Sequence, residues 1–236
     1  MSISSENTSG KEIKNIYSIS PFTLLDYPGH PACIIWFAGC NMRCSYCYNP
    51  DIVLGKGRLT YTGALDFLRS RSGLLQGVVL SGGECLLHSS VPEFAARIRD
   101  LGFLVKVDTN GSRPEVLKEL IDRSLADYVS LDFKALPDRE VAVTGGKYFE
   151  GFRQCLDLLL DSPVTFEVRT TVHSNLLQSR DLLKMSSFLA QSGYSGVYYL
   201  QKFQRNAPTL GKPGPDRGGI DLAALETSPL SIQIRG

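Results

Sequence analysis

The chain has 236 residues, of which 43% are hydrophobic and 21% charged, and this length suits one large domain. Its 25 Lys and Arg residues nearly balance 24 Asp and Glu residues, so the net charge of +1 gives no broad field to attract nucleic acid or an anionic membrane. No apolar run approaches the roughly 20 residues of a membrane-spanning helix. Residues 1–10 lack the basic and apolar regions of a signal peptide, so we expect a disordered polar tail over residues 1–14 and a cytoplasmic protein.

Short β-branched or aromatic runs alternate with amphipathic segments, which is typical of repeated βα units on a parallel sheet. Strands are predicted at residues 32–37, 77–80, 103–108, 128–132, 164–172 and 196–200. Helices are predicted between them, at residues 61–71, 91–101, 114–123, 148–160 and 177–191. A closed barrel of eight such units typically takes about 250 residues. Six units therefore predict an α/β fold of the open, partial (β/α)6 barrel kind.

Three regions are expected along the chain. The disordered tail covers residues 1–14, and the barrel domain covers residues 15–203. Residues 204–236 form a C-terminal extension that begins with a Pro- and Gly-rich stretch without periodicity, which predicts a loop or lid. Residues 231–235 alternate well enough to predict a terminal strand.

Six cysteines are the compositional feature that needs an explanation. Without an export signal the thiols are expected to stay reduced, which favours metal or redox chemistry. Cys40, Cys44 and Cys47 have C-x3-C-x2-C spacing directly after the strand at 32–37, and ligands bind at the carboxyl ends of parallel strands. Thiolates bind zinc or iron-sulfur clusters. On a cubane cluster, three cysteines would leave one iron free for a substrate, whereas zinc would need a fourth ligand from His30, Cys33 or Cys85.

This cysteine loop resembles the signature of the radical S-adenosylmethionine (SAM) superfamily. The resemblance implies a partial TIM barrel in which the three cysteines hold a 4Fe-4S cluster and SAM chelates the fourth iron. One electron then cleaves SAM to methionine and a 5′-deoxyadenosyl radical, which abstracts a hydrogen atom. Tyr46 occupies the aromatic position that contacts the adenine in that superfamily.

Glycines and a carboxylate follow the second predicted strand, in Ser81-Gly82-Gly83-Glu84. A Gly-Gly pair taken alone is usually only a turn. The resemblance implies that Gly82, Gly83 and Glu84 receive the amino group of SAM. Cys85 stands where the superfamily usually has proline.

Polar residues also end the next two strands, Asp108 and Thr109 on one, Asp132 and Lys134 on the other. Each Asp alone could be a helix cap or a turn former, but two on adjacent strand ends predict an oxygen-rich site. The segment Asp-Thr-Asn-Gly is similar to one in the activating enzymes of glycyl radical enzymes. That similarity implies a monovalent cation near SAM at Asp108, Thr109 and Asp132, and a contact of Lys134 with SAM.

The strand at 164–172 puts Glu167, Arg169, Thr171 and His173 on one face by alternation, and such inward polar residues need partners. Arg169 matches an arginine that the same activating enzymes use toward SAM, and Thr171 lies beside it on that face. His173 is either a ligand-facing residue or an ordinary surface histidine. Asn49 matches an asparagine beside the SAM pocket.

Residues 21–29 and 48–51 resemble the activating proteins of anaerobic ribonucleoside-triphosphate reductase and, more distantly, of pyruvate formate-lyase. This resemblance implies a glycyl radical enzyme as the protein substrate and flavodoxin or ferredoxin as the electron donor. One alternative is a small-molecule radical SAM enzyme similar to 7-carboxy-7-deazaguanine synthase. Another, of a different class, is a non-catalytic metal-binding or electron-transfer protein.

Overall fold

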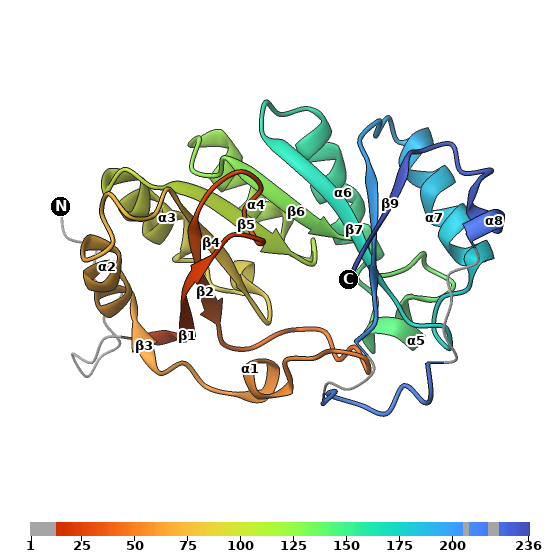
Figure 1. Cartoon of the computed structure of the whole chain (residues 1–236), viewed down its shortest axis with the longest axis horizontal. Helices are drawn as coiled ribbons and strands as arrows, with labels where there is room; N and C mark the ends of the chain where they lie inside the picture. Colours follow the sequence, from red (N-terminus) through yellow and green to blue (C-terminus); the bar gives the residue numbers. More distant parts are fainter. Residues whose placement is uncertain (1–12, 205–207, 217–221) are drawn as a thin grey trace. The chain divides into compact units, whose positions relative to one another are not determined.

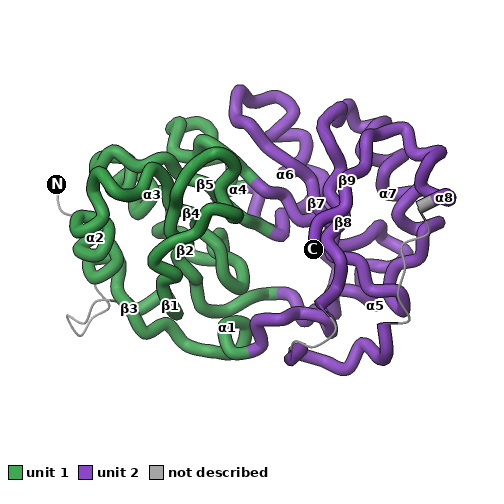
Figure 2. The backbone as a smooth tube through the Cα atoms, viewed as in Figure 1, with its two compact units in different colours: residues 1–41, 51–109, 115–129 green, residues 42–50, 110–114, 130–236 purple. Residues whose placement is uncertain are grey.

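The structure is a computed structural model that describes residues 13–204, 208–216 and 222–236. It divides the chain into two compact units (Figure 2). Unit 1 comprises residues 1–41, 51–109 and 115–129, and unit 2 comprises residues 42–50, 110–114 and 130–236. The predicted disordered tail lies outside the described residues except for its last two. The structure corrects the predicted tail at Lys14, which already begins a strand and pairs with Thr60.

Unit 1 is built on a mixed sheet whose strands are drawn in red to yellow-green in Figure 1. Their order is β3-β1-β2-β4-β5. The strands are β1 (Lys14–Thr23), β2 (Ala32–Phe37), β3 (Leu59–Thr60), β4 (Gly77–Gly82) and β5 (Leu104–Thr109). The three strands of this list that the sequence predicted, β2, β4 and β5, pair in parallel, whereas β1 and β3 form an antiparallel edge that the sequence did not predict.

The helices of unit 1 begin where the sequence offers helix-starting residues. Thr60 caps α2 by accepting a hydrogen bond from the Gly63 backbone N–H, and Pro92 lies in the first turn of α3. Phe37 of β2 packs edge-on against Phe94 of α3, with ring centroids 6.2 Å apart. The helical elements are α1 (Pro50–Leu54), α2 (Tyr61–Arg69), the 3-10 turn η1 (Cys85–Leu87), α3 (Val91–Asp100) and α4 (Pro114–Asp122).

Unit 2 holds the second group of strands, in the order β6-β7-β8-β9. They are β6 (Tyr128–Asp132), which begins in unit 1, then β7 (Thr165–Val172), β8 (Tyr198–Lys202) and β9 (Ile232–Arg235). Phe133 stacks on Phe152 with centroids 4.2 Å apart, which anchors α6 in the core of the unit. The helices are α5 (Glu140–Thr144), α6 (Phe149–Leu160), α7 (Ser179–Gln191) and α8 (Leu222–Leu225).

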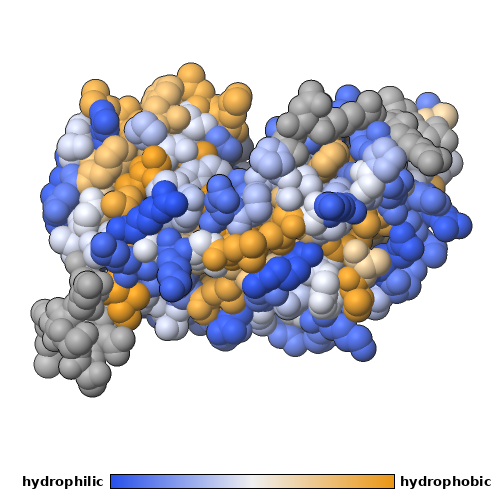
Figure 3. Space-filling model, turned by 90° about the horizontal axis from the view of Figure 1, so that it is seen from below, coloured by the Kyte–Doolittle hydropathy of each residue, from blue (hydrophilic) through white to orange (hydrophobic). Residues whose placement is uncertain are grey.

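The predicted alternation of strands and helices is confirmed. All six predicted strands are present, as β2 and β4 to β8, and β8 lies two residues further along the chain than predicted. The terminal strand β9 is also present. No helix among the described residues is long and apolar enough to span a membrane. On the face drawn in Figure 3, hydrophobic residues form separate groups among hydrophilic ones.

The strand directions decide where the candidate site residues lie. Because β2 and β4 run parallel and in register from Ala32 and Gly77, their carboxyl ends lie at the same edge. The segment with Cys40 leaves that edge after β2, and Ser81–Glu84 leaves it at the end of β4. The single barrel domain over residues 15–203 stays a prediction.

Candidate functional site

Gly82 and Gly83 lie directly against the chain that leads into Cys40. The Gly83 N–H donates to the Phe37 carbonyl and the Glu84 N–H donates to the Gly39 carbonyl, each at 3.0 Å. A Cβ atom on Gly83 would overlap the Gly39 carbonyl, and one on Gly82, whose φ is +130°, would overlap the backbone of Phe37. Glycine is therefore required at both positions by close backbone approach, which positions Glu84 beside the start of the cysteine loop.

Glu84 is only 2% exposed, and two donors of the chain bind its carboxylate. Oε1 accepts hydrogen bonds from the Thr109 hydroxyl at 2.8 Å and from the Leu86 N–H at 3.0 Å. The structure thus joins two of the predicted residues, Glu84 from β4 and Thr109 from β5. A buried carboxylate with fixed oxygens is suited to receive a cationic group of a ligand.

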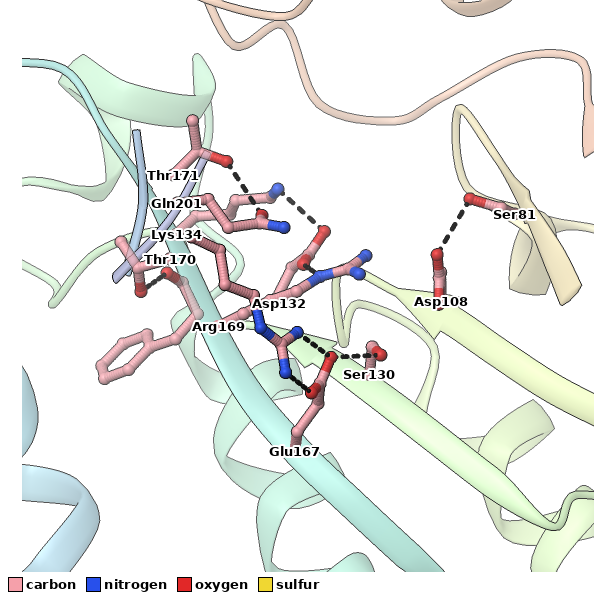
Figure 4. A network of polar contacts seen from close by, with 12 residues as sticks. Ser81, Asp108, Ser130, Asp132, Lys134, Glu167, Arg169, Thr170, Thr171 and Gln201 are labelled. Carbon is pink, nitrogen blue, oxygen red and sulfur yellow. Dashed lines mark hydrogen bonds and ion pairs between the residues drawn. The ribbon is translucent and has the colours of Figure 1, made fainter. Parts of the chain in front are cut away.

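Asp108 has two partners that the sequence did not single out. Its Oδ2 accepts a hydrogen bond from the Ser81 hydroxyl at 3.2 Å (Figure 4), and its Oδ1 forms an ion pair with Lys106. The Asp108 side chain is 11% exposed. Together with Glu84 and Thr109 it forms an acidic group in unit 1.

Asp132, Lys134 and Arg169 meet in unit 2, and Figure 4 shows both cations pointing toward the carboxylate. Arg169 Nε lies 2.5 Å from Asp132 Oδ1, and Lys134 Nζ lies 3.0 Å from Oδ2. Burial alone would raise the pKa of Asp132, but Arg169 and Lys134 outweigh it and lower that pKa to about 2. In turn Asp132 raises the pKa of Lys134 against the opposing effect of burial. The group carries two cations for one carboxylate, so it has an excess of positive charge.

Cys44, Tyr46 and Cys47 belong to unit 2, whereas Cys40 belongs to unit 1. All three cysteines are free thiols. Burial raises the pKa of the Cys44 thiol, and nearby Lys134 opposes that rise. The Tyr46 hydroxyl is buried and has no hydrogen-bond partner among the described residues.

The C-terminal extension contacts this cysteine loop. The Leu210 N–H donates to the Cys47 carbonyl and the Gly211 N–H donates to the Ser45 carbonyl, both at 2.9 Å. Residues 208–216 contain no helix or strand, in agreement with the predicted loop. The loop is therefore held against the cysteine segment by its backbone.

His173 is fully buried, so the interpretation as a surface histidine is wrong. Its ring lies edge-on to Phe203 at 4.6 Å, and Phe203 in turn stacks on Tyr48, which follows Cys47. Nδ1 accepts a hydrogen bond from the Asn175 N–H at 3.2 Å. A neutral imidazole that accepts at Nδ1 carries its proton on Nε2, and Nε2 is buried without a partner among the described residues. The Nε2–H of His173 is thus a buried donor that no described residue satisfies.

The remaining predicted residues have simpler surroundings. The Thr171 hydroxyl lies 3.5 Å from Gln201 Oε1, at the limit of a hydrogen bond (Figure 4). Asn49 is partly exposed. Glu167 does not face a ligand, because Arg235 of β9 binds both of its oxygens at 2.9 and 3.1 Å.

The candidates for a fourth zinc ligand are engaged elsewhere. Cys33 lies at the amino end of β2, away from Cys40, and burial raises its pKa to about 12. The Cys85 thiol is buried and donates to the carbonyls of Leu80 and Asp108. His30 Nδ1 lies 2.9 Å from the Gln76 side-chain oxygen. These contacts give the zinc alternative no support.

Two residues near the site were missed by sequence reasoning. His88 Nε2 lies 3.1 Å from the Ala38 carbonyl, two residues before Cys40. A lone histidine in a loop gave no signal of this contact. Lys106 did carry a signal, because a lysine within the apolar run of a central strand requires a buried partner.

Comparisons with known proteins identify the family of the chain. Residues 34–176 match the family described as the Radical SAM superfamily. A Methanocaldococcus jannaschii protein named as a glycyl-radical enzyme activating enzyme is 31% identical over 199 residues, which are 80% of each chain. The pyruvate formate-lyase-activating enzyme of Clostridium pasteurianum is 32% identical over 181 residues, which are 72% of this chain and 73% of that enzyme.

A solved structure supports the fold. The crystal structure of Streptococcus suis SuiB bound to S-adenosylmethionine matches with a TM-score of 0.65 and 12% identity, over 86% of this chain and 52% of SuiB. The chain thus spans about half the length of that protein, and the likeness concerns the fold alone. It confirms the predicted partial barrel. Because the family match covers more than half of the residues and both sequence relatives cover more than two thirds, the chain is an enzyme that belongs to the radical SAM superfamily.

Proposed function

We propose that this enzyme activates a glycyl radical enzyme by abstracting a hydrogen atom from a glycine Cα of that partner. The observation that carries the proposal is the similarity to two activating enzymes over more than two thirds of the chain. Cys40, Cys44 and Cys47 would hold a 4Fe-4S cluster. With one electron from a reductant, the bound cluster would cleave SAM to methionine and the 5′-deoxyadenosyl radical, which becomes 5′-deoxyadenosine on taking the glycine hydrogen.

Three observations on the chain support binding of the cluster and SAM. The cysteines are free thiols at the spacing of the superfamily. Gly82 and Gly83 let the backbone before Glu84 pack directly on the segment that leads into Cys40, where any side chain would collide. Tyr46 Oη and His173 Nε2 are buried without partners among the described residues, and a bound ligand would satisfy such atoms.

The methionine moiety of SAM carries two charged groups on its α-carbon, and the chain offers groups of opposite sign for each. Its α-amino group is positive, and unit 1 offers the buried carboxylate of Glu84 with Asp108 on the next strand. Its α-carboxylate is negative, and unit 2 offers Lys134 and Arg169, which outnumber their shared carboxylate. Pairing each charged group of SAM with side chains of opposite sign would fix its orientation before any chemistry takes place.

The adenosyl end would be bound by Tyr46, Asn49, Thr171 and His173. Tyr46 Oη and His173 Nε2–H can each donate to an acceptor of the nucleoside. Thr171 is held only weakly by Gln201 and can turn toward a ligand. These assignments are predictions. The monovalent cation that the resemblance implies at Asp108, Thr109 and Asp132 is a prediction too, and the ion pairs that Asp108 and Asp132 already form would compete with it.

For the partner we propose anaerobic ribonucleotide reductase, with flavodoxin or ferredoxin as the electron donor, in the cytoplasm. The segments at residues 21–29 and 48–51 support this partner. The net charge of +1 means that shape and apolar contact, more than a long-range field, would select the partner. Exposed Phe22, Leu24 and Leu25 within the first segment provide apolar contact area.

Electron paramagnetic resonance tests the proposal. Anaerobically reconstituted enzyme, reduced with dithionite and mixed with SAM and the reductase, should give the doublet of a glycine-centred radical and one equivalent of 5′-deoxyadenosine. Cys44→Ala should give neither. Formation of 5′-deoxyadenosine without a glycyl radical, in a reductase preparation that a known activating enzyme can activate, would favour a small-molecule substrate. Failure to form 5′-deoxyadenosine at all would favour the non-catalytic alternative.

A further inference from the structure

Lys106 is a buried cation in the middle of β5. Its side chain is only 2% exposed, and it forms an ion pair with Oδ1 of Asp108 two residues later. Residues i and i+2 of a strand point to the same face, so the sequence itself places the ammonium beside the carboxylate. The Tyr128 ring lies on another side of the ammonium, with its centroid 5.8 Å from Nζ.

The two charges of this pair depend on each other. A buried ammonium or carboxylate is costly unless each has the other as a partner, and removal of one leaves an uncompensated charge. Asp108 is fixed further by Ser81, whose hydroxyl donates to Oδ2. Each of the two carboxylate oxygens therefore has a donor from the chain itself.

A metal cation at Asp108 would compete with these donors. An ammonium group and a monovalent cation such as K⁺ carry the same charge and seek the same carboxylate oxygens. Two such charges on one carboxylate repel each other, and they do so strongly where water is excluded. Asp132, the second carboxylate of the implied cation site, is likewise already bound by Arg169 and Lys134.

From this arrangement we infer that Lys106 supplies the positive charge at Asp108 from within the chain, so that SAM binds without a monovalent metal cation at that carboxylate. This inference rests on the proposed SAM site. It makes Lys106 a positioning residue, because Lys106 would act through the Asp108 carboxylate that it holds in place.

The first test compares salts on the unaltered, cluster-loaded enzyme. SAM affinity is measured by anaerobic titration calorimetry in KCl, NaCl and tetramethylammonium chloride at equal ionic strength. Tetramethylammonium carries the same charge but is too large to enter a carboxylate site. We expect dissociation constants within about twofold of one another. Affinity at least tenfold weaker in tetramethylammonium than in KCl or NaCl would overturn the inference.

The second test removes the built-in cation. In Lys106→Met, Asp108 lacks its cation, so a metal cation should take its place. The thermal unfolding midpoint of the cluster-free variant should then depend on K⁺ or Na⁺, and so should the SAM affinity of the cluster-loaded variant. Lys118→Met is the matched control, because Lys118 pairs with Asp122 at a site where both side chains are 56% exposed. Equal behaviour of Lys106→Met and Lys118→Met in all three salts would count against the inference.

A further variant covers the case in which Lys106→Met does not fold. Lys106→Met combined with Asp108→Asn removes both charges, and its unfolding midpoint should again be the same in all three salts. If the unfolding midpoint of this double variant still depended on K⁺, the Asp108 carboxylate would not be the group that binds the cation. These readouts need no partner protein, so they are distinct from the glycyl radical test. Loss of SAM affinity in tetramethylammonium together with normal radical formation in KCl would overturn only this inference.

Discussion

Gly83 is the position where one added carbon should disturb the cysteine loop most directly. In Gly83→Ala, the new Cβ would overlap the Gly39 carbonyl and come within 3.0 Å of Cys40 Cβ. Backbone cannot yield as a flexible side chain does, so the two segments must separate. Overpacking of this kind costs about 1–3 kcal/mol. Weakening the hydrogen bonds from the Gly83 and Glu84 N–H groups adds about 1 kcal/mol, for a total of about 2–4 kcal/mol.

Urea unfolding of the cluster-free protein measures this loss, and iron content after reconstitution reports on the cysteine loop. Gly63→Ala is the matched control, because its Cβ would meet only the Thr60 hydroxyl, at 3.6 Å, inside helix α2. That control should be neutral or more stable by up to about 1 kcal/mol. If Gly83→Ala unfolds at the same urea concentration as Gly63→Ala and binds as much iron, the close backbone approach does not constrain the site.

Other substitutions test individual side chains. Tyr46→Phe should stabilise the cluster-free protein by about 1 kcal/mol toward urea, because it removes a buried hydroxyl without a partner, while it weakens SAM binding in calorimetry. Asp132 should contribute about 2 kcal/mol at pH 7, since its pKa is lowered from 3.8 to about 2. This stability is present above pH 4 and is lost as the pH falls toward 2, so urea unfolding of Asp132→Asn should lack that acid dependence. Arg235→Ala should cost about 3 kcal/mol, because Glu167, with 4% exposure, would lose its cation.

Distinct results would contradict each expectation. A less stable Tyr46→Phe protein would mean that the hydroxyl has a partner, and unchanged SAM affinity would place it away from the ligand. An acid dependence that survives in Asp132→Asn would come from another group. When Glu167→Gln is added to Arg235→Ala, most of the lost stability should return. If it does not, Arg235 acts instead by packing on Tyr199, whose ring centroid lies 3.4 Å from the guanidinium carbon of Arg235.

Much of the fold was predictable because its signals are local. Short runs of β-branched or aromatic residues indicated β2 and β4 to β8, because a parallel strand that is buried on both faces has apolar residues at nearly every position. β1 was missed because it is an antiparallel edge strand of mixed polarity, whose burial depends on pairing with β2. The same reason explains why Lys14, the first residue of β1, was assigned to the tail.

The sequence by itself determined the residues with fixed spacing: the three cysteines, Gly82-Gly83-Glu84 and the Asp residues at the strand ends. Ligand spacing and strand ends are set within a few residues, so they can be recognised without tertiary contacts. Which polar side chains already have a partner within the chain became clear only from tertiary contacts. Glu167 and Arg235 are 68 positions apart and pair with each other, whereas His173 is buried with an unpartnered nitrogen among the described residues. Burial and partner choice depend on contacts between distant segments, and no local pattern encodes them.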